Sequence, residues 1–386
     1  MQVPYWRLSG FYLLYFASLG ALIPYWSLYL QSEGYSPLAI GQLMAVIMAT
    51  KFVAPYFWGW IADHTGQGVR VVKLASLLAS LAFALVFIAD GFFQMMLVMA
   101  LFSFFWNATL PQFEAITFHF LGKESHRYSQ IRLWGSVGFI LTVVGIGILI
   151  DTIPLKYLPH IVLFFFCSIW VVALSVPGAR QAHQVVTGLS LRKIVFHPGV
   201  LALLAMSFFL QASHGTYYTF YSIYLENAGY TRPLIGGLWA LGVLAEIGVF
   251  MVMHLILPRH GARRLLLLTL VLTSVRWLLI GQFADNLMIL IFAQLFHAAS
   301  FGVYHAAAVH LINCYFQGHY RGRGQALYSS ISFGAGGAVG ILVSGMTWES
   351  LGSSQTFFLA ALFSLVGLVI TWFWIRPEEQ LNRMSV

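Results

Sequence analysis

Long apolar segments, each about 20 residues or more, follow one another along the whole chain. Only 8% of the 386 residues are charged, whereas a soluble domain usually carries about 25%. Lipid offers the backbone no hydrogen-bond partners, so segments that cross roughly 30 Å of hydrocarbon must be helices. The sequence therefore predicts an all-α membrane protein with twelve transmembrane helices, at about 6–30, 38–62, 72–90, 93–120, 128–150, 157–176, 199–225, 233–257, 264–283, 287–315, 324–346 and 354–375.

The most polar connection lies between the sixth and seventh segments, at residues 177–198, and Pro177 and Pro198 bracket it. We expect this connection to be a cytoplasmic linker between two six-helix bundles. The N-terminal bundle would cover residues 1–176 and the C-terminal bundle residues 199–386.

Basic residues are distributed unevenly over the connections. If the N-terminus is cytoplasmic, 15 of the 20 Lys and Arg residues fall on the inner side, and only Lys156 and Arg232 fall outside. This asymmetry predicts cytoplasmic N- and C-termini in a bacterial-type inner membrane. Anionic lipid at the inner surface accounts for the net charge of +8, so we expect no nucleic-acid partner.

A pattern in the first span recurs 195 residues later. Residues 25–30 read YWSLYL and residues 220–225 read FYSIYL, and Gly34-Tyr35-Ser36 matches Gly229-Tyr230-Thr231. Six spans separate the copies, and an even number preserves direction, so the two halves are predicted to be parallel repeats. Chance similarity between apolar segments is the alternative.

Five Lys, Arg and Glu side chains fall in the interior of the predicted spans, away from their ends: Lys51, Glu114, Arg132, Glu246 and Arg276. A charge at membrane depth is costly and usually faces a cavity or pathway. Removal from water raises the pKa of a carboxyl group, and a nearby cation lowers it again. A carboxylate whose cationic partner comes and goes is therefore suited to carrying a proton.

These charges have two competing interpretations. In the functional one, Glu246 and Glu114 carry protons, and Arg132, Arg276 and Lys51 bind the substrate with Glu114. In the structural one, Arg132 neutralises Glu114 or extends to the inner interface, and Glu246 forms a permanent pair with Arg276 or Lys51.

Histidines and aromatic residues extend the candidate site. His297 and His305 share a predicted helix face with Phe301 and Tyr304, which suggests that both histidines assist proton transfer. A second face begins at His214, and Trp26 is a further possible lining residue. Packing or a purely structural hydrogen bond is the alternative for each. The substrate-binding candidates on these faces are Trp26, His214, Tyr218, Tyr221 and Tyr304; their spacing predicts no metal site.

The connection after the second span contains Gly59, Asp63, Gly66 and Arg70. It resembles the G-x-x-x-D-x-x-G-R-[KR] signature of the major facilitator superfamily, although Gln67 replaces the first basic residue. The resemblance implies that Asp63 pairs with a neighbouring helix end and biases the inward/outward equilibrium. A solvated loop carboxylate is the alternative.

A closer resemblance covers nearly the whole chain. The segment Arg132–Phe139, together with Ala245-Glu246, Val275-Arg276 and Phe296-His297, is similar to the phenylpropionate permease group, whose relatives include lactose permease. Glu114 and Arg132 stand eighteen residues apart, as a sugar-contacting pair does in lactose permease. Lactose permease has a His at the position that matches His297, and a Glu three residues after that His. Ser300 stands at the position of this Glu here, so the resemblance implies a different proton route.

These observations predict a secondary transporter that takes up a small organic solute by alternating access. The best candidate is an aromatic carboxylate such as a phenylpropanoate, with protons as the coupling partner and no cofactor besides the proton gradient. A sugar or nucleoside symporter is the alternative within the class. A receptor or a membrane-embedded enzyme is the alternative outside it, although the sequence has none of the common hydrolase or nucleotide-binding motifs. We expect a monomer.

Overall fold

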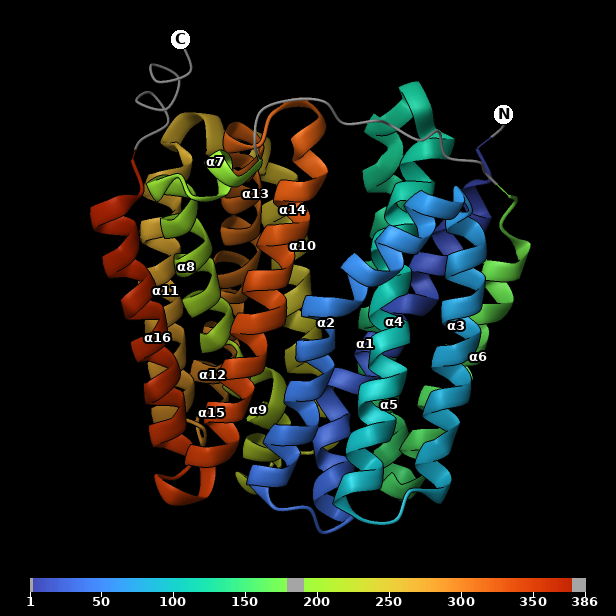
Figure 1. Cartoon of the computed structure of the whole chain (residues 1–386). Coiled ribbons are helices and arrows are strands. Elements are labelled where there is room, and N and C mark those ends of the chain that lie inside the picture. Colours follow the sequence, from blue (N-terminus) through green and yellow to red (C-terminus); the bar gives the residue numbers. More distant parts are fainter. Residues whose placement is uncertain (1–2, 179–190, 377–386) are drawn as a thin grey trace. The chain divides into compact units, whose positions relative to one another are not determined.

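The computed structural model describes residues 3–178 and 191–376. In these ranges twelve helices are long and apolar enough to cross a membrane, and their bounds lie within four residues of the predicted segments. The all-α prediction with twelve spans is thus confirmed (Figure 1). The spans of the first half are formed by α1 (Tyr5–Ser32), α2 (Pro37–Thr65), α3 (Gly68–Ala84) with the 3₁₀ turn 85–88, α4 (Phe92–Leu121), α5 (Tyr128–Thr152) and α6 (Leu158–Ser175).

The second half contains more interruptions than the first. Its spans are formed by α8 (Pro198–Ser213) with α9 (Gly215–Asn227), α10 (Arg232–His260), α11 (Ala262–Gln282), α12 (Leu287–Leu295) with α13 (Tyr304–Tyr315), α14 (Arg321–Ser329) with α15 (Gly337–Ser350), and α16 (Ser353–Trp374). A short helix, α7 (Leu191–Val195), precedes them. The seventh span breaks at His214, and π-helical turns at 298–303 and 330–336 interrupt the tenth and eleventh. None of these breaks was predicted.

The repeat is visible in the element boundaries. Helix α2 begins at Pro37 and α10 begins at Arg232, 195 residues later. The turn glycines recur at the same offset: Gly66 has φ 62° and Gly261 has φ 74°. This left-handed region is costly for residues with a Cβ, so glycine ends both helices.

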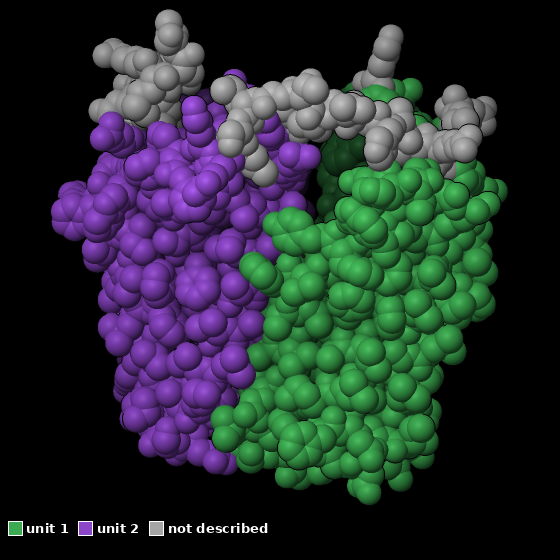
Figure 2. Space-filling view, viewed as in Figure 1, with its two compact units in different colours: residues 1–185, 229–240 green, residues 186–228, 241–386 purple. Residues whose placement is uncertain are grey.

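The chain divides into two compact units (Figure 2). Among the described residues, unit 1 comprises 3–178 and 229–240, and unit 2 comprises 191–228 and 241–376. The first turns of α10 thus group with unit 1. Most of the expected linker, residues 179–190, lies outside the described residues, so the predicted domain division stays a prediction.

Small residues set the closest helix contacts in each unit. In unit 1, α1 packs against α5 and α6, and α4 packs against α2 and α3. A Cβ added to Gly138 of α5 would collide with the Leu13 carbonyl of α1. In unit 2, a Cβ on Gly340 of α15 would collide with the Ala212 carbonyl of α8. Glycine at these positions lets the backbones touch, as is common in membrane bundles.

Cations hold the C-terminal end of the last span in each unit. In unit 1, Arg7 Nη1 donates to the Ser175 carbonyl at 3.0 Å and Lys73 Nζ to the Leu174 carbonyl at 3.2 Å. In unit 2, Arg263 donates to the Ile375 and Trp372 carbonyls at 2.6 and 2.9 Å. These contacts satisfy carbonyls that a helix end leaves without intrahelical partners.

Candidate functional site

The Arg276 guanidinium of α11 is the centre of a polar cluster in unit 2. Its side chain is fully buried, and the rings of Tyr217 and Trp277 lie 4.4 and 4.6 Å from its Cζ. Nη1 donates to Ser300 Oγ at 2.9 Å, and Nη2 donates to Gln294 Oε1 at 2.7 Å. Two aromatic faces and several hydrogen bonds therefore compensate the burial of this charge.

His297 connects Arg276 to Glu246. Arg276 Nη1 lies 3.1 Å from His297 Nδ1, and His297 Nε2 lies 3.6 Å from Glu246 Oε2. A guanidinium can only donate, so Nδ1 must accept and the imidazole proton resides on Nε2, facing the carboxylate. The expected pairing of Arg276 with Glu246 is therefore indirect and runs through the imidazole.

The tyrosine face of α9 adjoins this cluster. Tyr217 Oη donates to Gln294 Oε1 at 3.4 Å, and the Tyr217 and Tyr221 rings lie 4.7 Å apart. His214 is fully buried at the break between α8 and α9, where its Nδ1 lies 2.9 Å from the Leu210 carbonyl. Tyr217 and Tyr221 are also buried, whereas Tyr218 is half-buried. Of the candidates on this face, Tyr218 is the one with partial access.

His305 lies two helical turns after His297 in the tenth span, and the Phe301 ring lies between them. The Phe301 ring stacks between His297 and His305, with centroid distances of 5.6 and 5.9 Å. His305 Nδ1 lies 3.2 Å from Tyr328 Oη, and Tyr304 is fully buried beside Tyr328. The predicted shared face of these residues is present, and a phenyl ring separates the two imidazoles.

Arg132 has a different environment in unit 1. Its guanidinium lies over the Phe16 ring, with Cζ 3.8 Å from the centroid, and the side chain is half-buried. A Cβ added to Gly135 would lie 2.7 Å from both Arg132 Nη1 and Phe16 Cδ2, so glycine makes room for the stack. Within the described ranges, Arg132 makes neither a hydrogen bond nor an ion pair.

Glu114 of α4 is held by a tyrosine. Tyr128 Oη donates to Glu114 Oε1 at 3.1 Å, and Arg132 is the nearby positive charge. No ion pair within 4.0 Å joins Glu114 to Arg132 among the residues that the structure describes. The structural alternative, in which Arg132 exists to neutralise Glu114 directly, therefore lacks the contact it requires.

Lys51 lies at a helix irregularity in α2. Pro55 stands four residues later, and a proline ring at that position displaces the carbonyl of Lys51 from helical bonding. On the preceding residue, Thr50 Oγ1 donates to Ser103 Oγ at 2.9 Å and accepts from Asn107 Nδ2 at 3.0 Å. Lys51 itself is half-buried and has no polar partner in the described part of the chain. Its predicted partner Glu246 belongs to the other unit, and that pairing stays a prediction.

The connection between α2 and α3, which resembles the superfamily signature, has an ordinary turn geometry. Gly66 ends α2 in the left-handed region, and Arg70 Nη1 donates to Gln67 Oε1 at 2.8 Å. Asp63 is exposed and has no ion pair in the ranges described, so the pairing implied by the resemblance is not made here. Gly59 faces Gln112 of α4.

Trp26 of α1, a predicted lining residue, is fully buried against Tyr29 and Phe83.

Several polar partners were missed by the sequence analysis. Gln294 and Ser300 bond to Arg276, and the signal available for them was their spacing of three residues on either side of the predicted His297 within an apolar span. Tyr128 and Phe16 were missed because they contact Glu114 and Arg132 from other helices. No group of three or more His, Cys, Asp or Glu side chains among the described residues has a metal-site arrangement.

Comparison with known proteins identifies the family. The family described as MFS_1 like matches residues 5–360. The chain belongs to this family. The predicted resemblance to major facilitator transporters is thereby confirmed, and the protein is a multi-pass membrane transporter rather than an enzyme.

Relatives of this major facilitator protein carry different substrate names. The chain is 30% identical to a probable 3-phenylpropionic acid transporter of Escherichia coli (strain K12), with 98% of each chain covered. It is 25% identical to a maltose permease of Geobacillus stearothermophilus, with 96% of this chain and 94% of the relative covered. The crystal structure of the nucleoside transporter NupG has the same fold, with a TM-score of 0.81 at 15% identity over 97% of this chain and 100% of that one.

Proposed function

We propose that the chain is a proton-coupled symporter that takes up an aromatic carboxylate, such as a phenylpropanoate, by alternating access. The observation that carries the proposal is the Arg132 guanidinium, which stacks on Phe16 while its N–H donors have no partner in the described part of the chain. A planar guanidinium binds a carboxylate through two parallel hydrogen bonds, and aromatic side chains suit an aromatic ring. The name of the 30% identical relative supports the same substrate class.

Glu246 is the proposed proton carrier. Its carboxylate lies 3.6 Å from His297 Nε2, and 18% of its side chain is exposed, so it has an imidazole close by and is not sealed inside the unit. Glu114, bonded to Tyr128, is proposed as a second protonatable group near the substrate anchor. Uptake of a carboxylate together with a proton would neutralise the substrate charge during translocation, which lowers the cost of moving it through the membrane.

His297 and Arg276 are proposed as positioning residues for Glu246. Protonation of His297 at Nδ1 would break its bond to Arg276, so the neutral imidazole is the stable bridge between the guanidinium and the carboxylate. Arg276 is fully buried and already bonded at Nη1 and Nη2. Because both terminal nitrogens of the guanidinium are used in this way, we propose a positioning role for Arg276 in place of the substrate-binding role that the sequence suggested.

The orientation and location are part of the same proposal. The excess of basic residues on one side supports cytoplasmic termini, and the bacterial relatives support an inner-membrane location. The protein is proposed to act as a monomer. Asp63, Gly59, Gly66 and Arg70 are proposed to influence the conformational equilibrium, as the signature implies.

Transport by purified protein in liposomes tests the proposal. Radiolabelled 3-phenylpropionate is expected to accumulate when the outside is acidified, and a protonophore is expected to abolish the accumulation. Unlabelled aromatic acids should compete, whereas maltose and uridine should not. Strong competition by maltose or uridine would contradict the aromatic-acid proposal. It would favour a sugar or nucleoside substrate, in line with the similarity to maltose permease and NupG. No flux of any of these solutes under an imposed pH gradient would contradict the symport proposal.

A further inference from the structure

An apolar groove runs along the outer face of α11 and α16 in unit 2. It has a volume of about 460 Å³, and side chains from both helices line it, among them Leu267, Leu268, Val271, Leu368, Trp372 and Phe373. Leu268, Trp372 and Phe373 are 55%, 61% and 70% exposed. In a membrane-spanning bundle, such an exposed apolar channel faces acyl chains rather than water.

Two arginines lie at the end of the groove where α11 begins and α16 ends. Arg264 precedes Leu267, Leu268 and Val271 by three, four and seven residues, so it shares their helix face. Its side chain is exposed. Arg264 therefore lies on the groove side of α11, in the first turn of that helix.

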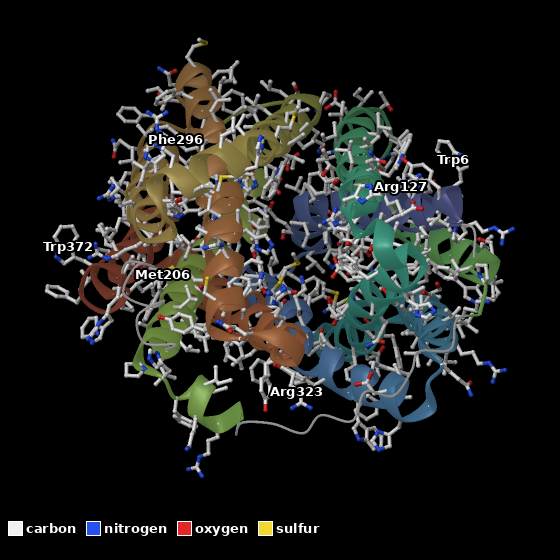
Figure 3. The ribbon with its side chains drawn as sticks, turned by 90° about the horizontal axis from the view of Figure 1, so that it is seen from above. Trp6, Arg127, Met206, Phe296, Arg323 and Trp372 are labelled. Atoms are coloured by element: carbon white, nitrogen blue, oxygen red, sulfur yellow. The ribbon has the colours of Figure 1, made fainter. Side chains whose placement is uncertain are left out.

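Arg263 adds a second, fixed cation to this end. Its Nε and Nη2 donate to the Ile375 and Trp372 carbonyls, and its Cζ lies 5.8 Å from the Trp372 ring. Nη1 is not used in these bonds and is available to an anion. Trp372, labelled in Figure 3, lies at the outer edge of unit 2. Tryptophan is typical of the depth at which lipid headgroups begin.

We propose that this groove binds an anionic phospholipid, with an acyl chain along α11 and α16 and the phosphate at Arg263 and Arg264. The apolar lining alone would accept any acyl chain. The paired guanidiniums distinguish a headgroup with net negative charge from a zwitterionic one, because each basic side chain near the membrane surface attracts anionic lipid. The proposal requires only that unit 2 spans the membrane and is independent of the substrate and of proton coupling.

Native mass spectrometry of the full-length protein tests this site with two defined lipids. The protein in detergent is titrated with dioleoyl phosphatidylglycerol or dioleoyl phosphatidylcholine, and bound lipid is counted. The wild type is expected to bind phosphatidylglycerol more tightly. Arg264→Gln should weaken that binding about fivefold, the equivalent of about 1 kcal/mol for one basic side chain, with little effect on phosphatidylcholine.

Arg323→Gln is the matched control, because Arg323 is another exposed arginine of unit 2 and Figure 3 shows it apart from Trp372. It should leave lipid binding unchanged. Equal losses in the two variants, or equal affinities of the wild type for the two lipids, would overturn the headgroup assignment.

A groove variant tests the acyl chain separately. Val271→Trp fills the channel while both arginines remain, and it should weaken binding of both lipids. Glycerol phosphate supplies the headgroup charge without a chain and is expected to compete poorly. Full competition by glycerol phosphate would show that the groove does not hold the lipid. The same conclusion would follow if the Val271→Trp variant had the melting temperature of the wild type and bound both lipids as tightly as the wild type does.

Discussion

Unit 1 and unit 2 each hold a membrane-buried arginine near a glutamate, and the two arginines differ in how far their hydrogen bonds are satisfied. Arg276 in unit 2 is bonded to Gln294, His297 and Ser300 and is fully buried. Arg132 in unit 1 lies on the Phe16 ring, is half-buried, and has no polar partner among the described residues. A guanidinium whose terminal nitrogens both bond within the protein orders its neighbours, whereas one without such bonds can bind an anion from outside the protein.

The difference suggests a division of labour between units that began as repeats. The common architecture places charges within both halves, but only unit 2 surrounds its arginine with amide, imidazole and hydroxyl acceptors. We therefore propose that unit 2 carries the principal proton carrier, Glu246, and that unit 1 carries the carboxylate anchor, Arg132. Substitutions in each unit should affect one of these properties and leave the other largely intact.

The largest expected effect comes from Glu246→Gln in unit 2. Without a titratable group at this position, an imposed pH gradient should no longer drive accumulation, and internal and external substrate should equalise. Exchange of internal for external substrate should persist, because Arg132 is unchanged. Both are measured in liposomes with labelled 3-phenylpropionate. Retention of pH-driven accumulation would remove Glu246 from the coupling role.

Arg132→Gln in unit 1 should have the next largest effect. Loss of charged hydrogen bonds worth about 1.5–3 kcal/mol should weaken the apparent affinity for the carboxylate about 10- to 100-fold. Arg132→Lys should be intermediate, because an ammonium keeps the charge without the planar fork. Equilibrium binding of the aromatic acid is the measurement.

Arg127→Gln provides the control for a change of net charge in the same unit. Arg127 is partly exposed and pairs with Glu124 at 2.6 Å in the turn that precedes α5. Its loss should change affinity less than about twofold, as expected for an exposed pair. Equal effects of the Arg127 and Arg132 substitutions would mean that general electrostatic attraction, not a specific anchor, governs binding.

His297 provides a sharper test of the assignments within unit 2. The amide of His297→Gln can accept from Arg276 and donate to Glu246, so pH-driven uptake should fall by less than about tenfold, the cost of one imperfect hydrogen bond. His297→Leu can do neither and should impair coupling further. If His297→Gln abolishes pH-driven uptake as completely as Glu246→Gln, the histidine carries the proton and the positioning role is wrong.

The smallest effects concern packing, in which the two units should behave alike. Gly138→Ala and Gly340→Ala each place a methyl group against a carbonyl of a neighbouring helix, and each should destabilise the fold by about 1–3 kcal/mol. Gly145 and Gly248 have no atom within 4 Å of an added Cβ, so alanine there should be neutral or stabilise by about 0.5–1 kcal/mol. Thermal unfolding in detergent measures all four. A Gly138→Ala or Gly340→Ala variant as stable as the wild type would show that these glycines do not limit how closely the helices approach.

Much of the fold could be predicted because the membrane restricts the alternatives. Apolar length alone located the spans, and Gly34-Tyr35-Ser36 with its copy at Gly229 revealed the repeat. The π-helical turns around Ser300 and Ser332 could not be predicted, since the length and apolar character that locate a span do not depend on whether a turn inside it is α- or π-helical.

The sequence was sufficient to predict the charged residues of the candidate site. It was not sufficient to predict the residues that contact them. Glu246, His297 and Arg276 stand out because charge at membrane depth is rare. Their order in the network depends on which atoms meet, and a sequence does not specify that Nδ1 of His297 faces the guanidinium. Likewise, Tyr128 reaches Glu114 from a different helix, so no spacing rule connects them.

The cations that hold α6 and α16 have a consequence for how the chain can be divided. Arg7 and Lys73 satisfy the last carbonyls of α6, and Arg263 does the same for α16, from residues of the same unit in each case. These two helix ends therefore keep their cationic partners if the polypeptide is cut between its two six-span halves. Unit 1 would nevertheless be complete only after two such fragments associate, because residues 229–240 of unit 1 lie on the second fragment.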